Sequence, residues 1–334
     1  MTGASRPLVT VEDIRAAAER IAGRVVRTPL VPYPAADPGR PLWFKPESLQ
    51  PTGAFKLRGA FNAILQRLDE ARSHGVVTHS SGNHARAVAW VARELGLRAT
   101  IVIPDAAPAV KVDAVRRLGA EVVIVAPEDR DTRAFALAAE HGYVMIPPYD
   151  DAAIVAGQGT IGLEIAADLG RLDAVLVPIS GGGLIGGIAT AVKALSPGTR
   201  VIGVEPELAA DAAESFRTGQ RVSWTPEQTY RTIADGLRTT SVGEIPWRQI
   251  QEYVDDVITV SEDEIRDGVR RLAADARLVA EPSGAVPFAA YLHHAGELGV
   301  DGAIVAVVSG GNLAMDTLAR IIAPATPAAP TSGG

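Results

Sequence analysis

The sequence contains no cysteine among its 334 residues. This absence excludes disulfides, thiolate metal sites and cysteine nucleophiles, and it favours a reducing compartment. No stretch approaches the roughly 20 apolar residues that a membrane-spanning helix requires. Segment 1–21 also lacks the basic residues followed by an apolar run that mark a secretory signal. We therefore expect a cytoplasmic protein with no membrane partner.

Charge and histidine are also limited. The net charge is -7, charged residues make up 21% of the chain and hydrophobic residues 47%. This composition is typical of a globular protein with one large domain or two, and it argues against a general affinity for nucleic acid. The six histidines form no H-E-x-x-H zinc pattern, and the chain has no G-x-S-x-G elbow of a serine hydrolase.

Lysine is scarce beside 28 arginines. The four lysines are Lys45, Lys56, Lys111 and Lys193. Arginine serves wherever a generic positive charge is enough, whereas a lysine amine can lose its proton and attack a carbonyl. Apolar neighbours flank Lys56, and we interpret Thr52 and Gly53 as the N-cap of a helix. Both surroundings disfavour the ammonium ion, so the pKa of Lys56 should fall toward neutrality. A lysine on a solvated helix surface is the alternative, and we expect it for Lys111 and Lys193.

Short β-branched runs alternate with helical patterns along most of the chain. In residues 75–147 we expect strands at 75–80, 98–104, 120–126 and 143–147, and helices at 83–95, 110–118 and 133–141. From residue 157 onward we expect strands at 173–179, 200–207, 257–260 and 303–309, and helices at 160–169, after Gly183, after the capping box Ser261…Glu264, and at 284–293. Both series predict parallel α/β units, and together they predict a shared cleft.

A glycine-rich segment, Ser180–Gly187, lies between an expected strand and an expected helix. Glycines there let the backbone approach a phosphate, whose charge the N–H groups and the helix dipole stabilise. The same segment satisfies G-x-G-x-x-G through Gly181, Gly183 and Gly186. Because Glu205 follows at the end of the next strand, an NAD-binding fold is an open alternative.

Two more turns follow expected strands. Ser309-Gly310-Gly311-Asn312 comes after strand 303–309. Since ligands of parallel α/β sheets bind at the carboxyl ends of strands, two glycine turns suggest one ligand held from two strands; an ordinary tight turn is the alternative. Segment Ser80–His84 comes after strand 75–80, and its hydroxyls, amide and N–H groups at a helix start predict a site for a substrate carboxylate.

Taken together, these four motifs resemble those of the serine racemase and threonine dehydratase group of fold-type II pyridoxal-phosphate enzymes. The correspondence is collinear from about Ile14 to Ala319. The resemblance implies an α/β fold of two parallel-sheet domains with the cofactor in the cleft. The large domain would contain residues 1–70 and 149–322, and the small domain residues 71–148. The Pro/Ala/Gly-rich segment 323–334 is expected to be disordered.

The resemblance also implies roles for individual residues. Lys56 matches the lysine that forms a Schiff base with pyridoxal 5′-phosphate. Phe55 would pack on the cofactor ring, Asn83 would bond its phenolic oxygen, and Ser309 would face its pyridine nitrogen. The phosphate would lie in the loop of Ser180, Gly181, Gly182, Gly183 and Leu184. The substrate carboxylate is expected on the loop of Ser81, Gly82, Asn83 and His84. Ser81 also matches the second acid or base of serine racemases, on the cofactor face opposite the lysine.

A divalent-metal site is implied near the end of strand 200–207. Glu205 and Asp211 would supply carboxylates and Ala209 a backbone carbonyl to Mg²⁺ or Ca²⁺, with waters completing the oxygen shell. A solvated acidic loop is the alternative. A homodimer is expected from the resemblance alone.

The implied activity is an ammonia-lyase that converts L-threonine, L-serine or 3-hydroxyaspartate to a 2-oxo acid and ammonia. A serine or aspartate-type racemase that uses Ser81 is the main alternative, and an NAD-dependent oxidoreductase is a remote one. Three departures from the family pattern leave the substrate open. Ala54 stands where Ser is usual, Arg86 where Gln or Gly is commoner, and Tyr149 where serine racemases carry Asn. Arg86 could favour a second carboxylate, as in 3-hydroxyaspartate, and a solvated helix residue is the alternative.

Overall fold

The structure is a computed structural model that describes residues 8–323. Its larger sheet has six strands in the spatial order β1 (Val31–Pro32), β2 (Leu42–Pro46), β10 (Ile304–Val308), β7 (Ala174–Pro178), β8 (Arg200–Pro206) and β9 (Asp256–Val260). Every neighbouring pair is parallel except β1 with β2. The central strands β7 and β10 are buried along their whole length, which explains why both read as continuous apolar runs.

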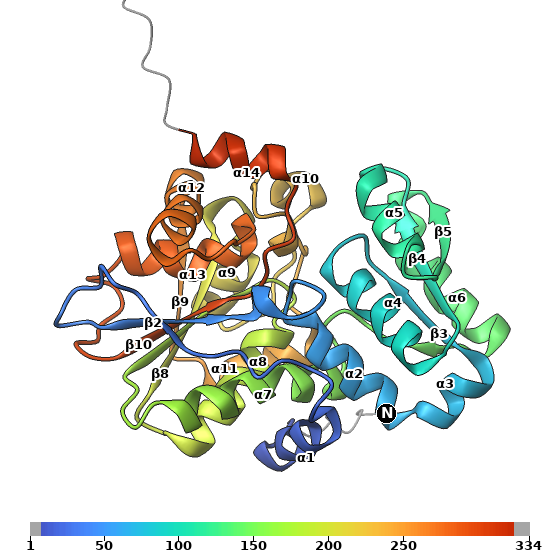
Figure 1. Cartoon of the computed structure of the whole chain (residues 1–334), viewed down its shortest axis with the longest axis horizontal. Helices are drawn as coiled ribbons and strands as arrows, with labels where there is room; N and C mark the ends of the chain where they lie inside the picture. The colour runs from blue at the N-terminus through green and yellow to red at the C-terminus, as the bar shows by residue number, and fades with distance from the viewer. Residues whose placement is uncertain (1–7, 324–334) are drawn as a thin grey trace, which may run out of the picture.

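The smaller sheet has four parallel strands in the order β5 (Glu121–Val125), β4 (Ala99–Pro104), β3 (Val76–His79) and β6 (Val144–Met145). The prediction of two parallel α/β units is therefore confirmed, and Figure 1 shows the two sheets side by side. All four strands of the smaller sheet fall within residues 71–148, although the exact domain boundaries stay a prediction. The predicted disorder of segment 323–334 lies, from residue 324 on, outside the described residues.

Helices cover both sheets (Figure 1). Around the smaller sheet lie α2 (Lys56–Gln66), α3 (Leu68–His74), α4 (Asn83–Leu95), α5 (Ala109–Arg116) and α6 (Arg130–His141). The remaining helices are α1 (Val11–Ile21), α7 (Ala152–Asp168), α8 (Gly183–Leu195), α9 (Asp211–Thr218), α10 (Pro226–Thr229), α11 (Glu244–Tyr253), α12 (Glu262–Arg271), α13 (Pro282–His293) and α14 (Met315–Ile322). Short 3-10 turns are η1 (Glu47–Leu49), η2 (Pro127–Asp129), η3 (Glu207–Ala209) and η4 (Asp235–Leu237), and α12 runs into the π-helical segment η5 (Leu272–Ala276).

Helix α7 starts eight residues before the predicted boundary at residue 160. Asp151 caps it, because one carboxylate oxygen accepts hydrogen bonds from the N–H groups of Ala153 and Ile154. Its glycines weaken the helical pattern but permit close packing. A Cβ at Gly157 would lie 2.6 Å from the Cα of Gly59 on α2. The first half of α7 therefore lacks a clear helical pattern in the sequence, because its glycines are needed for close contact with α2.

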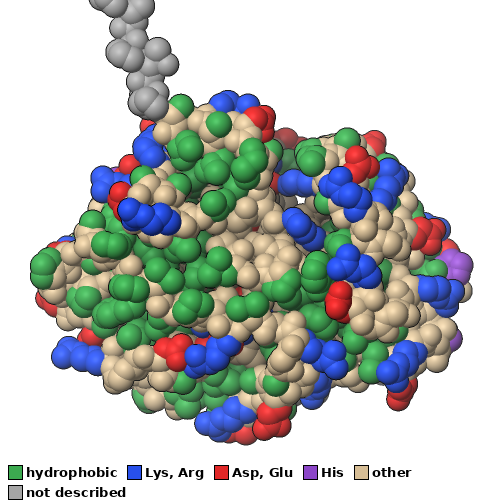
Figure 2. Space-filling view, viewed as in Figure 1, with side chains coloured by type: hydrophobic (Ala, Val, Ile, Leu, Met, Phe, Trp, Pro, Cys, Tyr) green, Lys and Arg blue, Asp and Glu red, His purple; other side chains and the backbone are tan. Residues whose placement is uncertain are grey.

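The outer surface differs between the two halves of the molecule. In Figure 2 hydrophobic side chains gather over the half that contains the larger sheet, whereas lysine and arginine side chains are frequent over the smaller one. The surface is hollowed between the part formed by α5 and the part formed by α10 and α14. An ion pair joins α5 to η4, from Lys111 to Asp235 at 2.5 Å.

Candidate active site

Three of the four motifs singled out in the sequence contact one another at the carboxyl ends of β3 and β10. The glycine loop after β7 packs on Tyr149, the residue that follows the Pro148 carbonyl to which Lys56 donates. The N–H of Phe55 donates to the carbonyl of Ser309 at 3.0 Å, and Ala54 forms an isolated bridge with Gly310. The amide of Asn312 donates to the side-chain oxygen of Asn83 at 2.8 Å. Segments up to 260 residues apart in the sequence thus meet in one place, as predicted.

Lys56 is the first residue of α2 and is partly buried. Its Nζ donates to the backbone carbonyl of Pro148 at 2.6 Å and lies 5.1 Å from the centre of the Phe55 ring. Desolvation by burial lowers the pKa of Lys56 from 10.5 to about 8. The predicted direction of this shift agrees with the structure, and the free-base fraction of this amine near neutral pH is larger than that of an exposed lysine.

The interpretation of Thr52 and Gly53 as a helix N-cap was wrong. Phe55 occupies the N-cap position of α2 and makes no side-chain capping bond. Gly53 instead adopts φ +74, which turns the chain so that its carbonyl accepts from the N–H of Gly311 at 2.9 Å. These residues therefore dock the loop on the turn after β10.

The glycine loop lies between β7 and α8, with Gly182 at φ +84 in the N-cap position. A Cβ at Gly181 would lie only 2.2 Å from Cγ of Tyr149, so the loop is packed too closely for any side chain there. Ser180 Oγ lies 2.7 Å from Thr239 Oγ1. Hydroxyls beside a helix N-terminus suit a phosphate, because the first N–H groups of the helix lack internal acceptors.

Asn83 belongs to a chain of side-chain hydrogen bonds. Its Nδ2 donates to Glu281 Oε1 at 2.6 Å, and its oxygen accepts from Asn312. Asn312 in turn accepts from Arg86 Nη1 at 2.7 Å. Burial raises the pKa of Glu281 to about 8, and the nearby charge of Asp235 adds to this rise. In this structure the guanidinium of Arg86 is therefore hydrogen-bonded to Asn312.

The predicted carboxylate loop spans the start of α4. His84 is buried, with Nε2 2.9 Å from the carbonyl of Ile146. Burial, with the charge of Lys56 as a smaller contribution, lowers the pKa of His84 to about 3, so its imidazole is neutral. Its Nδ1 has no hydrogen-bond partner among the described residues. Ser81 and Gly82 are partly exposed and precede this helix, so they remain accessible to a small ligand.

The predicted metal ligands also lie together, at the end of β8. The carboxylates of Glu205 and Asp211 are buried, and Ala209 lies in η3 between them in sequence. Glu205 Oε2 accepts from the N–H of Ala213 at 2.8 Å, whereas its other oxygen and both oxygens of Asp211 have no partner within residues 8–323. Burial raises the pKa of Glu205, with the charge of Asp211 adding to the rise, and burial raises the pKa of Asp211 to about 7.

This arrangement fits a divalent cation, because two buried carboxylates with three oxygens that lack partners favour either protons or a metal. Across residues 8–323 no group of three or more His, Asp and Glu side chains is arranged to hold a metal ion. The predicted set contains two carboxylates and a carbonyl, so it needs water to complete a shell.

Sequence reasoning missed two residues of the site, Thr239 and Glu281. Thr239 lies in the loop after η4 and meets Ser180 across 59 positions. Glu281 is the N-cap residue of α13 and meets Asn83 across 198 positions. Neither residue belongs to a local sequence motif. A single acidic residue before Pro282 indicates only an ordinary helix start.

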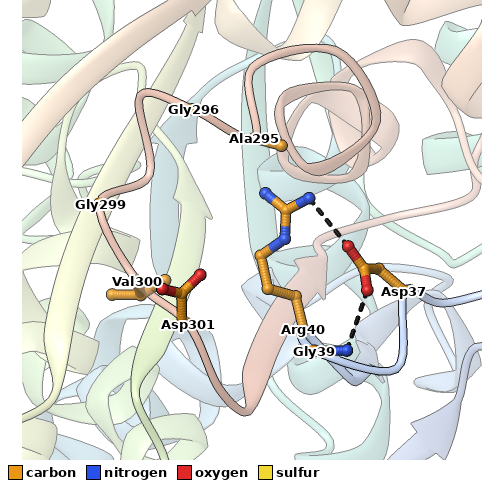
Figure 3. A pocket seen from close by; sticks show the side chains of 8 residues that line it. All are labelled: Asp37, Gly39, Arg40, Ala295, Gly296, Gly299, Val300 and Asp301. Atoms are coloured by element: carbon orange, nitrogen blue, oxygen red, sulfur yellow. Dashed lines mark hydrogen bonds and ion pairs between the residues drawn. The ribbon is translucent and has the colours of Figure 1, made fainter.

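A separate surface hollow of about 450 Å³ shares no residue with this site. It lies between the turn that leads from β1 to β2 and the loop that precedes β10 (Figure 3). Its only basic side chain, Arg40, is paired with Asp37 at 3.1 Å, and Asp37 also accepts from the N–H of Gly39. The hollow has none of the features that were predicted for a ligand site.

Comparisons with known proteins agree with the geometry. Residues 21–310 match the family model described as pyridoxal-phosphate dependent enzyme. The L-threo-3-hydroxyaspartate ammonia-lyase of Saccharomyces cerevisiae is 43% identical over 317 residues, covering 94% of this chain and 96% of that protein. The catabolic L-threonine dehydratase of Escherichia coli is 40% identical, covering 94% of this chain and 96% of that protein. The structure of maize serine racemase matches with a TM-score of 0.89 at 39% identity, covering 94% of this chain and 97% of that one.

These matches overturn the remote NAD alternative, and the structure gives the reason. Glu205 would have to reach a ribose at the sheet edge, but its carboxylate is fully buried beside Asp211.

The helices of residues 8–323 include none that is both long and apolar enough to cross a membrane. The family match over residues 21–310 and the 43% identity to the yeast enzyme show that the chain belongs to the pyridoxal-phosphate dependent enzyme family.

Proposed function

We propose that this protein is an ammonia-lyase that converts a hydroxy amino acid to a 2-oxo acid and ammonia, with Lys56 as the lysine that bonds the cofactor. The observation that carries the proposal is the Lys56 amine, whose pKa burial lowers to about 8 and which lies where the three strand ends meet. The hydroxyaspartate and threonine enzymes among the relatives support the reaction type.

The residues present fit pyridoxal 5′-phosphate. The N–H groups at the start of α8 and the hydroxyls of Ser180 and Thr239 would hold its phosphate. Phe55, Asn83 and Ser309 would contact the ring and its substituents. Once bound, the cofactor supplies an electron sink that makes the Cα proton of an amino acid acidic.

The chain's own groups perform the remaining tasks. The loop Ser81–His84 would bind the substrate carboxylate through N–H groups and hydroxyls, and the neutral His84 adds no charge of its own. The free amine of Lys56 would then remove the Cα proton, which its lowered pKa allows near neutral pH. The β-hydroxyl then leaves as water, and a second water hydrolyses the resulting enamine to the 2-oxo acid and ammonia.

A racemase is the second candidate, because Ser81 matches the residue that would return a proton from the face opposite Lys56. Maize serine racemase supports it through its similar fold and sequence. Which reaction dominates depends on whether Ser81 delivers a proton before the hydroxyl leaves.

Three substrates are proposed: L-threonine, L-serine and 3-hydroxyaspartate. Arg86 is bonded to Asn312, so it has one N–H fewer for a second substrate carboxylate than the sequence suggested. Tyr149 packs on Gly181 at the glycine loop. A panel of hydroxy amino acids, scored for ammonia release and for the enantiomer that remains, tests both the activity and the substrate. Absence of ammonia and of inversion with all three would contradict the proposal.

Three further features belong to the same proposal. Glu205, Asp211 and the carbonyl of Ala209 would bind Mg²⁺ or Ca²⁺, which the unpartnered carboxylate oxygens support. We also propose a homodimer, which the resemblance to the family supports, and a cytoplasmic location, which the absence of cysteine supports.

A further inference from the structure

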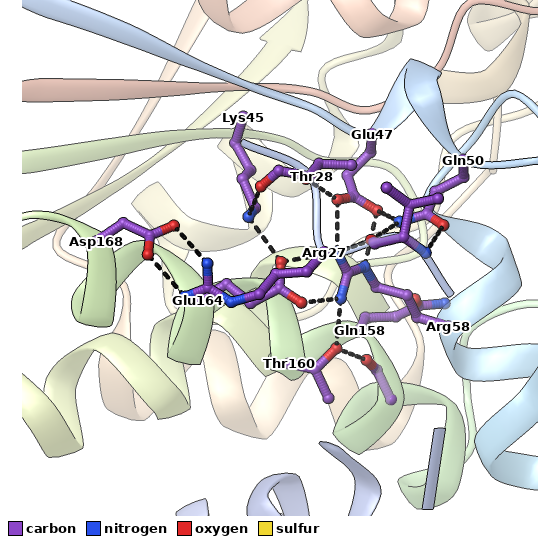
Figure 4. Close-up of polar contacts among 12 residues, drawn as sticks. Arg27, Thr28, Lys45, Glu47, Gln50, Arg58, Gln158, Thr160, Glu164 and Asp168 are labelled. Atoms are coloured by element: carbon purple, nitrogen blue, oxygen red, sulfur yellow. Dashed lines mark hydrogen bonds and ion pairs between the residues drawn. The ribbon is translucent and has the colours of Figure 1, made fainter. Parts of the chain in front are cut away.

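Four charged side chains, Lys45, Glu47, Arg58 and Glu164, form a cluster inside the protein, which we call the buried ion cluster (Figure 4). The side chains of Lys45, Glu47 and Arg58 are 0% exposed and that of Glu164 is 15% exposed. Two positive and two negative charges are therefore held together with almost no contact with water. The predictions from sequence gave none of these residues a function.

Arg58 is the centre of the buried ion cluster. Its Nε and Nη2 donate to the two carboxylate oxygens of Glu47, both at 2.8 Å, and its Nη1 and Nη2 donate to those of Glu164 at 2.7 and 2.9 Å. Lys45 Nζ donates to Glu164 and to the carbonyl of Thr28, both at 2.6 Å. Such bidentate pairing fixes the direction of the guanidinium as well as its position.

The buried ion cluster joins the segments that carry the site. Arg58 lies on α2, two residues after Lys56, and Glu47 lies at the other end of the loop that precedes α2. Glu164 lies on α7, which packs against α2. Lys45 lies on β2, opposite Val307 of β10, the strand that ends just before Ser309. The loop that leads into Lys56 and α2 is thus held at both ends, by Glu47 and by Arg58, and α2 is held against α7.

Charge balance matters more here than at the surface. Burial alone would raise the pKa of Glu47, but the charge and hydrogen bonds of Arg58, together with the Thr28 hydroxyl and the charge of Lys45, outweigh burial and lower it. Removing one member leaves an uncompensated charge buried in the cluster, which is strongly unfavourable, whereas apolar residues of similar volume can often replace a whole buried pair without loss. Stability alone therefore does not explain why charges occupy this place.

We infer that the buried ion cluster positions Lys56, with Arg58 as the positioning residue and Lys45 as the charge that balances the two glutamates. The inference rests on the proposed role of Lys56. When its positive and negative charges are equal, the cluster fixes the start of α2 relative to α7 and Ser309. When one charge is in excess, the start of α2, and with it Lys56, becomes more mobile.

The test uses the full chain loaded with pyridoxal phosphate. Lys45→Met leaves one cation and two carboxylates in the cluster. Combining it with Glu164→Gln leaves one cation, Arg58, and one carboxylate, Glu47, so the charges are equal again. Ile265→Ala is the matched control, because it destabilises a fully buried position on α12 in a different part of the core. The readouts are the rate at which cofactor escapes to a scavenger, the share of borohydride-fixed cofactor found on the Lys56 peptide, and the urea midpoint.

Lys45→Met is expected to lose cofactor roughly tenfold faster and to place less of the fixed cofactor on Lys56. The balanced double variant is expected to recover most of both losses. Ile265→Ala should lower the urea midpoint and leave cofactor loss almost unchanged. Should Lys45→Met fail to fold, Arg58→Lys, which keeps the charge but not the bidentate pairing, is expected to give the same faster loss.

Cofactor loss that follows the urea midpoint across all variants would overturn the inference, since a purely structural cluster predicts that relation. Failure of the proposed function looks different. In that case borohydride fixes no cofactor to Lys56 in the unaltered protein, whatever the variants do.

Discussion

The substitution Gly181→Ala tests the glycine loop as the phosphate site. The new Cβ would lie 2.2 to 2.5 Å from three ring atoms of Tyr149, whereas ordinary contact begins near 3.4 Å. The ring must therefore withdraw by about 1 Å. Tyr149 follows Pro148, whose carbonyl accepts the hydrogen bond of Lys56, so this movement also disturbs the amine. Overpacking of this kind costs about 1–3 kcal/mol, which corresponds to a roughly 5- to 150-fold change in an equilibrium constant.

The assay is a titration of the cofactor-free protein with pyridoxal phosphate, followed by absorbance. We expect Gly181→Ala to raise the dissociation constant within that range. Gly198→Ala is the control, because its Cβ would meet no atom within 4 Å. In a Tyr149→Ala background, the Gly181 substitution should cost little, since the clashing ring is gone. An equal loss of affinity in both backgrounds, or no loss in either, would refute the reasoning.

Three further outcomes are expected. Ser81→Ala should reduce racemisation much more than elimination, as measured by chiral chromatography and ammonia release; an equal loss of both would show that Ser81 is not the second base. Activity should rise with pH up to about 8, because the pKa of Lys56 is lowered to about 8 and only the free amine removes a proton; a flat profile between pH 6 and 8 would count against Lys56 as the base. With chelator present, the melting temperature should fall as pH rises through about 7 and recover when Mg²⁺ is added. The raised pKa values of Glu205 and Asp211 mean that the folded state binds protons more tightly than the unfolded state, so the stability present at low pH is lost as these protons leave. A melting temperature that does not change when Mg²⁺ is added at pH 8 would argue against the metal site.

Local signals in the sequence were sufficient for most strand–turn–helix units. The helix at 83–95 was predicted with its observed bounds, because a strand, a turn of small polar residues and a clear apolar period follow one another there. The two glycine turns and Ser81–His84 were placed at strand ends for the same reason. Their convergence also followed from sequence, since the carboxyl ends of parallel strands share one edge.

Features that depend on distant contacts could not be predicted in this way. The first half of α7 was missed because Gly157 serves the contact with α2 and weakens the helical pattern. Thr239 and Glu281 join the site only through the fold. Lys45 was noticed as one of four lysines, but its partner Glu164 lies 119 positions away, so the buried ion cluster has no local signature.

The central claim is that Lys56 bonds the cofactor, and borohydride reduction of the full-length protein tests it most directly. We predict a yellow protein in which reduction fixes pyridoxal phosphate to the peptide that contains Lys56, and not to those that contain Lys45, Lys111 or Lys193. A colourless protein after incubation with the cofactor, or a fixed label on any other lysine, would contradict the account.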